Sequence, residues 1–420
     1  MYIKKVHIEN IKSISQFDME FKKPAGWHVL IGDNGAGKTS IIRAIALALI
    51  GPDEALGLRT PWSDYLNRQS NDGKIRIDLI RQDVDKHTGR QAKLKNWLIP
   101  NILILKRKDG IVNLSVGKTK PNNIDPLKYN WGHGKGWFSV AYGPFRRFAG
   151  GNQEWQKIFY SQPKLGAHLS AFGEDIALTE TIEWLVKLNY QFLEGKDSGQ
   201  FLDSIKQFIN YSGFLPHHAE IKSISSDGVI FKDGNGSLIQ INQLSDGYRS
   251  ILSLAFELIR QLARIYGDDK VFKYNQKNQL IIDLPGVVLI DEIDAHLHPT
   301  WQTKVGQWFT KYFPKIQFIV TTHSPLVCRA CEKGSIWRLA APGSEIQSGE
   351  ITGTDKNRLI YGNILDAYGT EVFGDDVSQS EDSERLLKEL AELNVKSFKG
   401  TITISEKQRV NEIKTILPTA

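Results

Sequence analysis

Apolar and polar residues alternate along much of the first third of the chain. The first 31 residues, which begin MYIKKVHIENIKSI, show the alternation of two or three strands and end in the apolar run GWHVLIG. The segment 74–116 repeats this pattern, as in KIRIDLI and NILILKRKDGIVNLSV, and predicts an antiparallel meander. Residues 137–151, WFSVAYGPFRRFAGG, predict another strand that runs into a glycine-rich loop.

Helical spacing appears at three places in the chain. The segment KTSIIRAIALALIG predicts a helix that Gly51 and Pro52 stop. Residues 177–211 predict a helical insert, and residues 247–265 predict a long helix. Between the last two, GVIFKDGNGSLIQI (228–241) has a Gly/Asn turn between apolar runs and predicts a hairpin.

The C-terminal half alternates apolar strands with helical segments. GVVLI, IQFIVTT and GSIWRL are the strand-like runs, and this order predicts a mostly parallel sheet covered by helices, an α/β fold. SERLLKELAELN predicts an amphipathic helix near the end. We therefore divide the chain into an N-terminal lobe (1–150), a helical insert (151–215), a C-terminal lobe (216–345) and an extension (346–420).

Composition narrows the class of protein. Apolar residues make up 41% of the 420 residues and charged residues 24%, which is ordinary for a globular protein. We find no apolar run of transmembrane length and no signal-peptide core at the N-terminus, and two cysteines do not form a disulfide framework. These features predict a cytoplasmic protein without a membrane partner.

Charge is distributed unevenly along the chain. Residues 74–120 contain 12 Lys and Arg against 4 Asp and Glu, whereas residues 366–392 contain 9 acidic residues against 2 basic ones. The basic region is compatible with nucleic-acid binding and equally with a solvated meander whose edges carry lysine. The acidic helix is a candidate docking surface for a partner, and a solvated terminal helix is the equally weighted alternative.

The stretch GDNGAGKTS, Gly32 to Ser40, has the spacing of a phosphate-binding loop between a strand and a helix. Its glycines allow backbone N–H groups to face a phosphate, and the helix start adds a positive dipole end. In this motif Lys38 neutralises phosphate charge, and the Thr39 hydroxyl is a ligand for Mg²⁺. The motif therefore predicts that ATP and Mg²⁺ are the cofactors.

Two later strands end in polar residues. Val287–Ile290 leads to Asp291 and Glu292, which could hold the Mg²⁺ shell and orient or deprotonate an attacking water. The strand in FIVTTHSPLV delivers His323, which could hydrogen-bond the γ-phosphate or the water. A lone histidine at such a place is more often structural, but three strand-end motifs in this order favour a site.

The turn LSDGYRS precedes the helix predicted over 247–265. Ser245 and Gly247 lie at its start, where free backbone N–H groups form a second anion-binding end. Plain helix capping by Ser245 is the alternative, because serine is a good cap residue. One nucleotide cannot easily use both helix ends, whereas two copies arranged head to tail could.

The order of these motifs resembles the ATP-binding-cassette (ABC) ATPases of the SMC/RecF/OLD branch, and it resembles anti-phage defence ATPases of the Septu PtuA type within that branch. GDNGAGKTS looks like Walker A, LSDGYRS like the signature, VVLIDEIDAHLHP like Walker B with the D-loop, and TTHSP like the switch histidine. The segment AYGPFRRF (141–148) is similar to the same group, and the resemblance extends from residue 1 to about residue 340. It implies an ABC-type head without a long coiled coil.

The resemblance also assigns residues. It implies Glu292, His323 and Lys38 as catalytic residues, and Thr39 and Asp291 as metal ligands. The opening IKKVHIENIKSI adds Lys12 and Ser13 near the nucleotide. The implied nucleotide contacts are Lys12, Ser13, Asn34, Gly35, Ala36, Gly37, Lys38, Thr39, Ser40, Ser245 and Gly247. In this branch the signature serine of one copy contacts ATP held by the other, which implies a homodimer closed by ATP or a larger assembly of such dimers.

The sequence departs from the family pattern at several places. Gln153 is the best candidate for a Q-loop glutamine and a weak one, and Asp246 stands where transporter signatures have glycine. No Toprim-like Glu plus Asp-x-Asp set follows His323. Cys328 and Cys331 lack the two further ligands of a zinc site and are interpreted as core residues.

Three functional hypotheses follow. The first is a dimerising Mg-dependent ATPase that senses or clamps nucleic acid and controls a partner effector, such as a nuclease, in bacterial anti-phage defence. The second is a RecF-like DNA-repair ATPase, for which the partners would be repair proteins. The third is a standalone OLD-type nuclease, which the missing Toprim signature disfavours.

Overall fold

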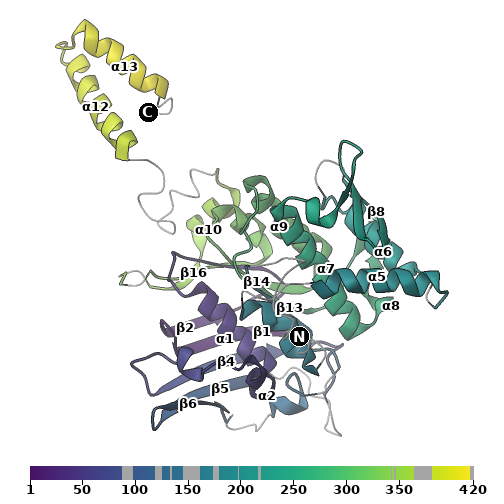
Figure 1. Ribbon diagram of the computed structural model, residues 1–420. Helices are drawn as coiled ribbons and strands as arrows, with labels where there is room; N and C mark the ends of the chain where they lie inside the picture. Colours follow the sequence, from purple (N-terminus) through teal and green to yellow (C-terminus); the bar gives the residue numbers. More distant parts are fainter. Residues whose placement is uncertain are drawn as a thin grey trace. The chain divides into compact units, whose positions relative to one another are not determined.

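The computed structural model describes residues 1–87, 98–118, 125–132, 135–144, 161–173, 179–196, 198–215, 219–341, 343–344, 347–363 and 381–416. The chain divides into two units, Met1–Tyr361 and Gly362–Ala420. The first unit contains every motif described above, and Figure 1 shows its elements.

A six-stranded sheet contains the strands that precede the Walker A, Walker B and histidine motifs. Its order is β16-β15-β3-β14-β13-β7, with β16 antiparallel to β15 and all other neighbours parallel. The strands are β3 (Gly26–Ile31), β7 (Ser139–Tyr142), β13 (Gly286–Ile290), β14 (Ile316–Thr322), β15 (Ser335–Arg338) and β16 (Gly349–Ile351). The predicted mostly parallel sheet is confirmed, and β14 lies between β3 and β13. The three motifs therefore emerge side by side at one edge.

A five-stranded antiparallel sheet has the order β2-β1-β4-β5-β6. The predicted meander is present as β4 to β6, and its first strand also pairs with β1, so that the N-terminal hairpin extends the same sheet. The strands are β1 (Tyr2–Ile11), β2 (Ile14–Glu20), β4 (Asp72–Ile80), β5 (Leu98–Lys108) and β6 (Ile111–Val116).

The helix α1 (Lys38–Ile50) packs in the core shared by the two sheets. Its sequence is apolar almost all round, and the whole stretch Ala44–Ile50 is buried, as expected for a helix covered on all sides. The helix ends at Gly51, whose φ is +84° and whose added Cβ would stand 2.7 Å from the Trp131 ring. Only glycine fits this close turn, so the predicted stop is confirmed.

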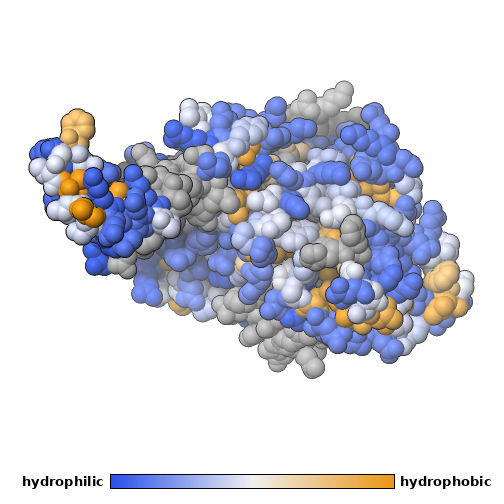
Figure 2. Space-filling model, turned by 90° about the horizontal axis from the view of Figure 1, so that it is seen from above, coloured by the Kyte–Doolittle hydropathy of each residue, from blue (hydrophilic) through white to orange (hydrophobic). Residues whose placement is uncertain are grey.

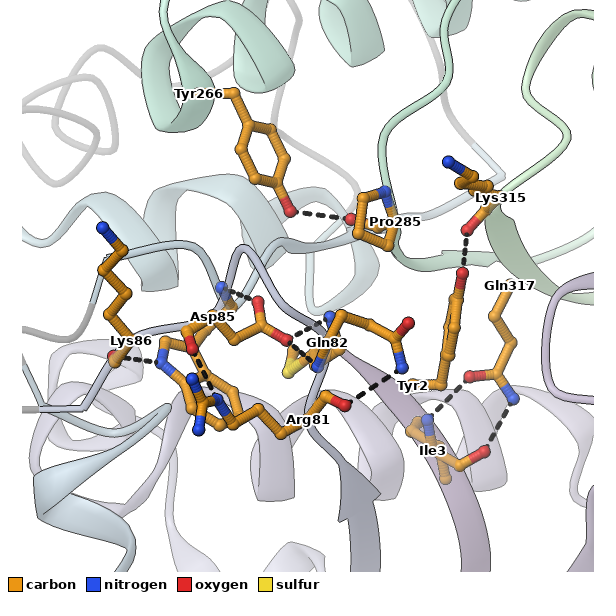
Figure 3. A network of polar contacts seen from close by, with 12 residues as sticks. Tyr2, Ile3, Arg81, Gln82, Asp85, Lys86, Tyr266, Pro285, Lys315 and Gln317 are labelled. Carbon is orange, nitrogen blue, oxygen red and sulfur yellow. Dashed lines mark hydrogen bonds and ion pairs between the residues drawn. The ribbon is translucent and has the colours of Figure 1, made fainter. Parts of the chain in front are cut away.

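A polar contact joins the start of β1 to the start of β14 (Figure 3). The side-chain amide of Gln317 accepts a hydrogen bond from the Ile3 N–H at 2.7 Å and donates one to the Ile3 carbonyl at 2.9 Å. Beside it, the Tyr2 hydroxyl donates to the Lys315 carbonyl at 2.8 Å. Gln317 is fully buried, so these bonds satisfy both halves of its amide and tie the antiparallel sheet to the central one.

Aromatic residues fill the other side of the central sheet. Trp27 of β3 lies 6.2 Å from Phe309 and 5.3 Å from Phe318, measured between ring centroids. Phe309 belongs to α9 (Pro299–Tyr312) and Phe318 to β14. The long helix α7 (Asp246–Tyr266) matches the prediction over 247–265, and it buries one face that includes Leu254 and Leu258.

The remaining elements of the first unit are shorter. The predicted helical insert is present as α5 and α6, and the predicted hairpin over 228–241 is β9 paired with β10. The small sheets have the orders β10-β9-β8 and β11-β12. The helices are α2 (Pro52–Ala55), α4 (Pro163–His168), α5 (Thr179–Leu193), α6 (Gln200–Tyr211), α8 (Asp268–Val271) and α10 (Gly353–Tyr361), and the strands are β8 (Glu220–Ser225), β9 (Gly228–Lys232), β10 (Leu238–Gln240), β11 (Lys273–Tyr274) and β12 (Leu280–Ile281). Single 3₁₀ turns are η1 (Leu56–Leu58), η2 (Trp62–Asp64), η3 (Pro126–Lys128), η4 (Leu169–Ala171) and η6 (Ile241–Gln243), and a longer 3₁₀ segment with a kink at Cys331 is η7 (Pro325–Lys333).

The second unit is a helical hairpin of α12 (Glu381–Phe398) and α13 (Ile404–Ile416). The first helix was predicted as amphipathic, and it buries Leu390 and Leu393 against Ile413 of the second. Ion pairs also cross the hairpin, such as Lys396 with Glu406 at 2.7 Å. This small core keeps the two helices together.

The surface is mostly hydrophilic, with hydrophobic residues in small separate groups on the face that Figure 2 shows. Among the described residues, no helix combines the length and the apolar character that crossing a bilayer requires.

Candidate nucleotide site

The phosphate loop runs from the end of β3 to the start of α1. Gly35 and Gly37 have φ values of +82° and +96°, which glycine adopts without strain. An added Cβ at Gly32 would stand 2.8 Å from the Leu339 carbonyl oxygen, so this glycine permits a close approach of two backbones. The loop residues Asn34 and Gly35 are exposed, and Ala36, Thr39 and Ser40 are partly so. The motif therefore has the backbone geometry that its sequence predicts.

Lys38 curls back over this loop. Its ammonium donates hydrogen bonds to the carbonyls of Gly32 at 2.7 Å and Asp33 at 3.0 Å. Burial lowers the pKa of Lys38, while the carboxylates of Glu292 and Asp291 act in the opposite direction. The cation thus binds its own loop and lies within electrostatic range of the acidic pair at the end of β13.

The turn between β1 and β2 reaches the same loop. An added Cβ at Gly37 would lie 3.5 Å from the Ser13 hydroxyl oxygen, so Ser13 is a neighbour of the helix start. Lys12 has a φ of +51°, and its ammonium lies 5.1 Å from the centroid of the Tyr65 ring. Burial lowers the pKa of Lys12, and the nearby Arg43 acts in the same direction. Both residues expected from the first strand therefore lie beside the phosphate loop or its flank.

The acidic pair is fixed by β14. The Thr321 hydroxyl donates to Asp291 Oδ1 at 2.5 Å and accepts from the Glu292 N–H at 2.7 Å. Asp291 is buried, and its own N–H donates to the Tyr142 carbonyl of β7 at 2.8 Å. Glu292 is partly exposed and has a φ of +46°. The chain therefore turns sharply at the end of β13 and separates a buried carboxylate from an accessible one.

His323 follows β14 and is exposed. Its backbone N–H donates to Asp294 Oδ2 at 3.3 Å. Asp294 in turn contributes to the negative potential at Lys38. The histidine thus lies next to the acidic turn, just after the strand that separates the Walker A and Walker B strands.

The donor chemistry at this edge fits Mg²⁺. Magnesium in nucleotide sites takes oxygen ligands, usually one or two from protein and the rest from phosphate and water. Thr39 and Asp291 supply a hydroxyl and a carboxylate of this kind. Within the described residues there is no cluster of three or more His, Cys, Asp or Glu side chains that could hold a metal by themselves.

The signature turn begins α7. Ser245 is exposed and is the residue before the helix, but its side chain makes no capping hydrogen bond. Asp246 is exposed and forms an ion pair with Arg249. Gly247 lies against the segment that follows Glu292, because its added Cβ would stand 2.6 Å from the His296 carbonyl oxygen. Ser245 therefore does not cap α7 with its side chain, which was the alternative interpretation of this residue.

Two other sequence expectations have different outcomes. Gln153, the candidate Q-loop residue, lies outside the described residues, as does part of AYGPFRRF. Cys328 and Cys331 are fully buried in η7, and burial raises the pKa of both thiols. Their interpretation as core residues is confirmed.

Part of the basic region lies beside acidic residues of β1 and β4. Arg76 pairs with Asp78 at 2.9 Å, and Lys74 lies opposite Glu9 across the β1–β4 pair. Lys106 and Lys108, near the turn between β5 and β6, are exposed. Arg90, Lys93, Lys95 and Lys120 lie outside the described residues. Of the described cations, those near the β5–β6 turn are therefore better placed for a polyanion than those on the sheet face.

The structure adds residues that sequence reasoning missed. Thr321 and Asp294 contact the acidic pair and the histidine, and no role was assigned to either from the sequence. Threonine is a common strand residue, so its presence in FIVTT carries little signal. Asp294 lies within the quoted Walker B stretch and could have been found from its spacing after Glu292.

Family models match both halves of this site. One described as "AAA ATPase domain" matches residues 1–99, and one described as "AAA domain, putative AbiEii toxin, Type IV TA system" matches residues 184–329. The first match covers the phosphate loop, and the second covers the signature turn, the acidic pair and His323.

Curated relatives include a Septu protein, a retron ATPase and a DNA double-strand break repair ATPase. A Septu protein PtuA of Bacillus mycoides (strain KBAB4) is 30% identical over 342 residues, which are 80% of this chain and 40% of the relative. A "Retron Ec83 probable ATPase" of Escherichia coli is 40% identical over 30% of this chain and 22% of its own length. A "DNA double-strand break repair Rad50 ATPase" of Nanoarchaeum equitans (strain Kin4-M) is 32% identical over 24% of this chain and 11% of its own. This chain spans 40% or less of the length of each of these relatives.

Solved structures similar to the chain include SMC heads. The "SMC head domain from Thermotoga maritima" aligns over 84% of this chain and 99% of its own with a TM-score of 0.42 and 13% identity. An Smc head from Pyrococcus furiosus, bound to the C-terminal domain of ScpA, aligns over 83% of this chain and 96% of its own with a TM-score of 0.45 and 16% identity.

Proposed function

We propose that this chain, a P-loop ATPase of the SMC/RecF branch related to the Septu PtuA proteins, hydrolyses Mg·ATP at sites shared by two copies. The observation that carries the proposal is the register of the central sheet, which brings the phosphate loop after β3 and the Thr321-held pair Asp291 and Glu292 after β13 to the same edge, with β14 between them. A cation and two acidic groups at the carboxyl ends of parallel strands of one sheet are what phosphoryl transfer needs.

Each residue has a distinct part in the proposed reaction. The loop N–H groups and Lys38 bind the phosphates, and Thr39 and Asp291 are the residues that would hold Mg²⁺. When bound, Mg²⁺ would offset negative charge on the phosphate oxygens. Glu292, the more accessible of the two acids, orients or deprotonates the attacking water, and His323 hydrogen-bonds the γ-phosphate or the water.

The signature turn completes the site of the other copy. Ser245 and the first N–H groups of α7 present an anion-binding end, and the Ser245 hydroxyl is not used as a helix cap. We place this turn against the γ-phosphate bound by the loop of a second copy. ATP would then close a homodimer, and assemblies of such dimers are compatible with the same geometry.

A Glu292→Gln variant tests the ATPase assignment. We expect nucleotide binding close to wild type, an ATP-dependent dimer that persists in size-exclusion chromatography, and hydrolysis slower by about 10² to 10⁴, the range for loss of a general base. Glu332→Gln is the matched control, because Glu332 is exposed on η7. Wild-type hydrolysis by Glu292→Gln contradicts the assignment.

We further propose that the ATPase controls a partner effector, such as a nuclease, in bacterial anti-phage defence. The Septu and retron relatives support this proposal. The α12–α13 hairpin, which forms a compact unit of its own, is the proposed docking element. Deletion of 376–420 should abolish co-purification of the partner and preserve ATP hydrolysis, and an intact complex after deletion contradicts this role.

Nucleic acid is the proposed ligand of the turn between β5 and β6. Lys106→Glu combined with Lys108→Glu should weaken DNA binding and reduce its dependence on salt, because fewer phosphate contacts release fewer counterions. Lys277→Glu combined with Lys304→Glu makes the same charge change at exposed positions elsewhere and should have a smaller effect. Equal losses in the two double variants contradict a role for this turn.

A DNA-repair ATPase is the second candidate, and the Rad50 relatives favour it. The two functions share the site described above and differ in what the dimer controls. Identification of the protein that co-purifies with the chain separates them, because a nuclease effector supports defence and a repair factor supports the alternative.

A further inference from the structure

Thr321 contacts three consecutive residues at the end of β13. Its carbonyl accepts from the Ile293 N–H at 3.0 Å, while its hydroxyl accepts from the Glu292 N–H at 2.7 Å and donates to Asp291 Oδ1 at 2.5 Å. Thr321 is fully buried, so none of these bonds competes with bulk water.

The single hydroxyl proton fixes the direction of this chain of bonds. Because the proton of Thr321 goes to Asp291, the oxygen of the same hydroxyl remains free to accept from Glu292 N–H. Asp291 Oδ1 must therefore act as an acceptor, which a carboxylate does best. The bond also defines the orientation of the whole Asp291 side chain.

The same contacts hold an unfavourable backbone conformation. Glu292 has a φ of +46°, in the left-handed region that residues with a side chain seldom occupy. Such a residue persists only where its surroundings determine it. The bonds from Glu292 N–H and Ile293 N–H both end on Thr321, so this one residue supports the turn on both sides of the Glu292 carbonyl.

We propose that Thr321 is a positioning residue that aims Asp291 at the metal and Glu292 at the water. The inference rests on the proposed function, because it assigns a role within that site. Thr321 acts through the two acids and touches neither nucleotide nor metal. Its hydroxyl, rather than its shape, carries the role, so serine should replace it and valine should not.

The test compares Thr321→Val and Thr321→Ser with Thr322→Val in the full chain. Thr322 is the adjacent buried threonine, and its hydroxyl bonds with Ser324 instead of the acidic pair, which makes it a matched control. Binding of a fluorescent ATP analogue is measured in EDTA and across a Mg²⁺ titration, and hydrolysis is measured across the same titration.

For Thr321→Val we expect wild-type binding in EDTA and a half-saturating Mg²⁺ concentration raised by about 10-fold to 100-fold, the usual cost of losing a group that orients a metal ligand. Thr321→Ser and Thr322→Val should stay within about threefold of wild type, well below that cost. A wild-type Mg²⁺ titration for Thr321→Val overturns the inference, as does a Thr321→Ser variant as impaired as Thr321→Val. If Thr321→Val does not fold, Thr321→Ala is judged by the same titration. Failure of this inference can be distinguished from failure of the proposed function. If the proposed function is wrong, the wild-type chain itself shows no hydrolysis that depends on Glu292.

Discussion

Gly247 lies directly against the carbonyl oxygen of His296, so that an added Cβ would stand 2.6 Å from it. His296 has a φ of +64°, which turns its carbonyl out of the path of a regular strand. Beside this contact, the rings of Tyr248 and Trp301 lie 6.1 Å apart in an edge-to-face arrangement. The signature turn is therefore seated on the segment that follows the acidic pair of the same copy.

Gly247→Ala should disturb the packing of the signature turn against this segment. Real Cβ atoms do not approach a backbone oxygen this closely, so the turn must shift. We expect nucleotide binding by the loop to persist while ATP-dependent dimerisation and hydrolysis fall, by up to about 100-fold if the shift approaches 1 Å. Gly349→Ala is the control, because its Cβ would meet nothing within 4 Å. Wild-type hydrolysis by Gly247→Ala would show that the close contact between Gly247 and the His296 carbonyl is not needed for ATP hydrolysis.

Ser245→Arg should block hydrolysis and leave nucleotide binding nearly intact. The exposed Ser245 leads α7, far in sequence from the phosphate loop, and a long cation there would obstruct the partner's phosphate. In a mixture with Lys38→Ala, activity should partly return, since one of the two shared sites contains neither change. Steady-state ATPase assays across mixing ratios check this, and activity that never exceeds the sum of the separate proteins argues against shared sites.

Asp246→Gly should strengthen ATP-dependent dimerisation. Asp246 places an exposed carboxylate on the first turn of α7, where the proposed partner phosphate approaches, and it pairs with Arg249. Its removal ends a like-charge repulsion and releases the guanidinium. We expect dimers at lower ATP concentration, measured by light scattering. Asp246→Asn should act in the same direction, and weaker dimerisation in both variants would contradict the electrostatic reason.

Gln317→Leu should destabilise the fold. Leucine is similar in size but leaves the Ile3 N–H and carbonyl buried without their partners. Each such group costs about 1 to 3 kcal/mol, so a loss of about 2 to 6 kcal/mol in the free energy of unfolding is expected. Chemical denaturation measures it. The exposed Gln307→Leu on α9 is the control and should change stability by less than about 0.5 kcal/mol, as for most surface sites.

Stability should fall as the solution becomes more acidic. Burial lowers the pKa of His28 and of His168 to about 4, from the ordinary 6.5. Between pH 4 and pH 6.5 the unfolded chain therefore binds more protons than the folded one. The stability that the two neutral histidines contribute is fully present above pH 6.5 and is lost progressively towards pH 4. Each unit is about 1.4 kcal/mol, which gives about 3 kcal/mol per histidine. Denaturation at several pH values tests this, and His28→Asn should flatten part of the slope.

The sequence predicted the central sheet well because its strands are buried on both faces. Runs such as GVVLI and IQFIVTT are mostly apolar for that reason, and each leads into polar residues where the sheet meets the site. The helix α1 was equally clear, with a glycine-rich loop before it and Gly51 behind it.

Contacts between distant segments could not be predicted in this way. Gln317 stands out as a polar residue in a buried strand, but nothing in its neighbourhood indicates that Ile3 receives both bonds. The bonds of Thr321 and the close contact of Gly247 likewise involve residues 25 or more positions away in the chain, and local patterns do not encode such contacts. The helix α13 was missed because its apolar positions are few and irregular.

The Gln317–Ile3 bridge makes two strands start from one fixed point. From there β14 runs towards Thr321 and His323, and β1 runs towards Lys12 and Ser13. Both strands that lead to the nucleotide site are thus held together at their starts, and neither lobe can slide there without breaking two buried hydrogen bonds. If the lobes move, we expect them to tilt about the Gln317–Ile3 contact. The displacement would then be largest at the far ends of β1 and β14, which carry the nucleotide site.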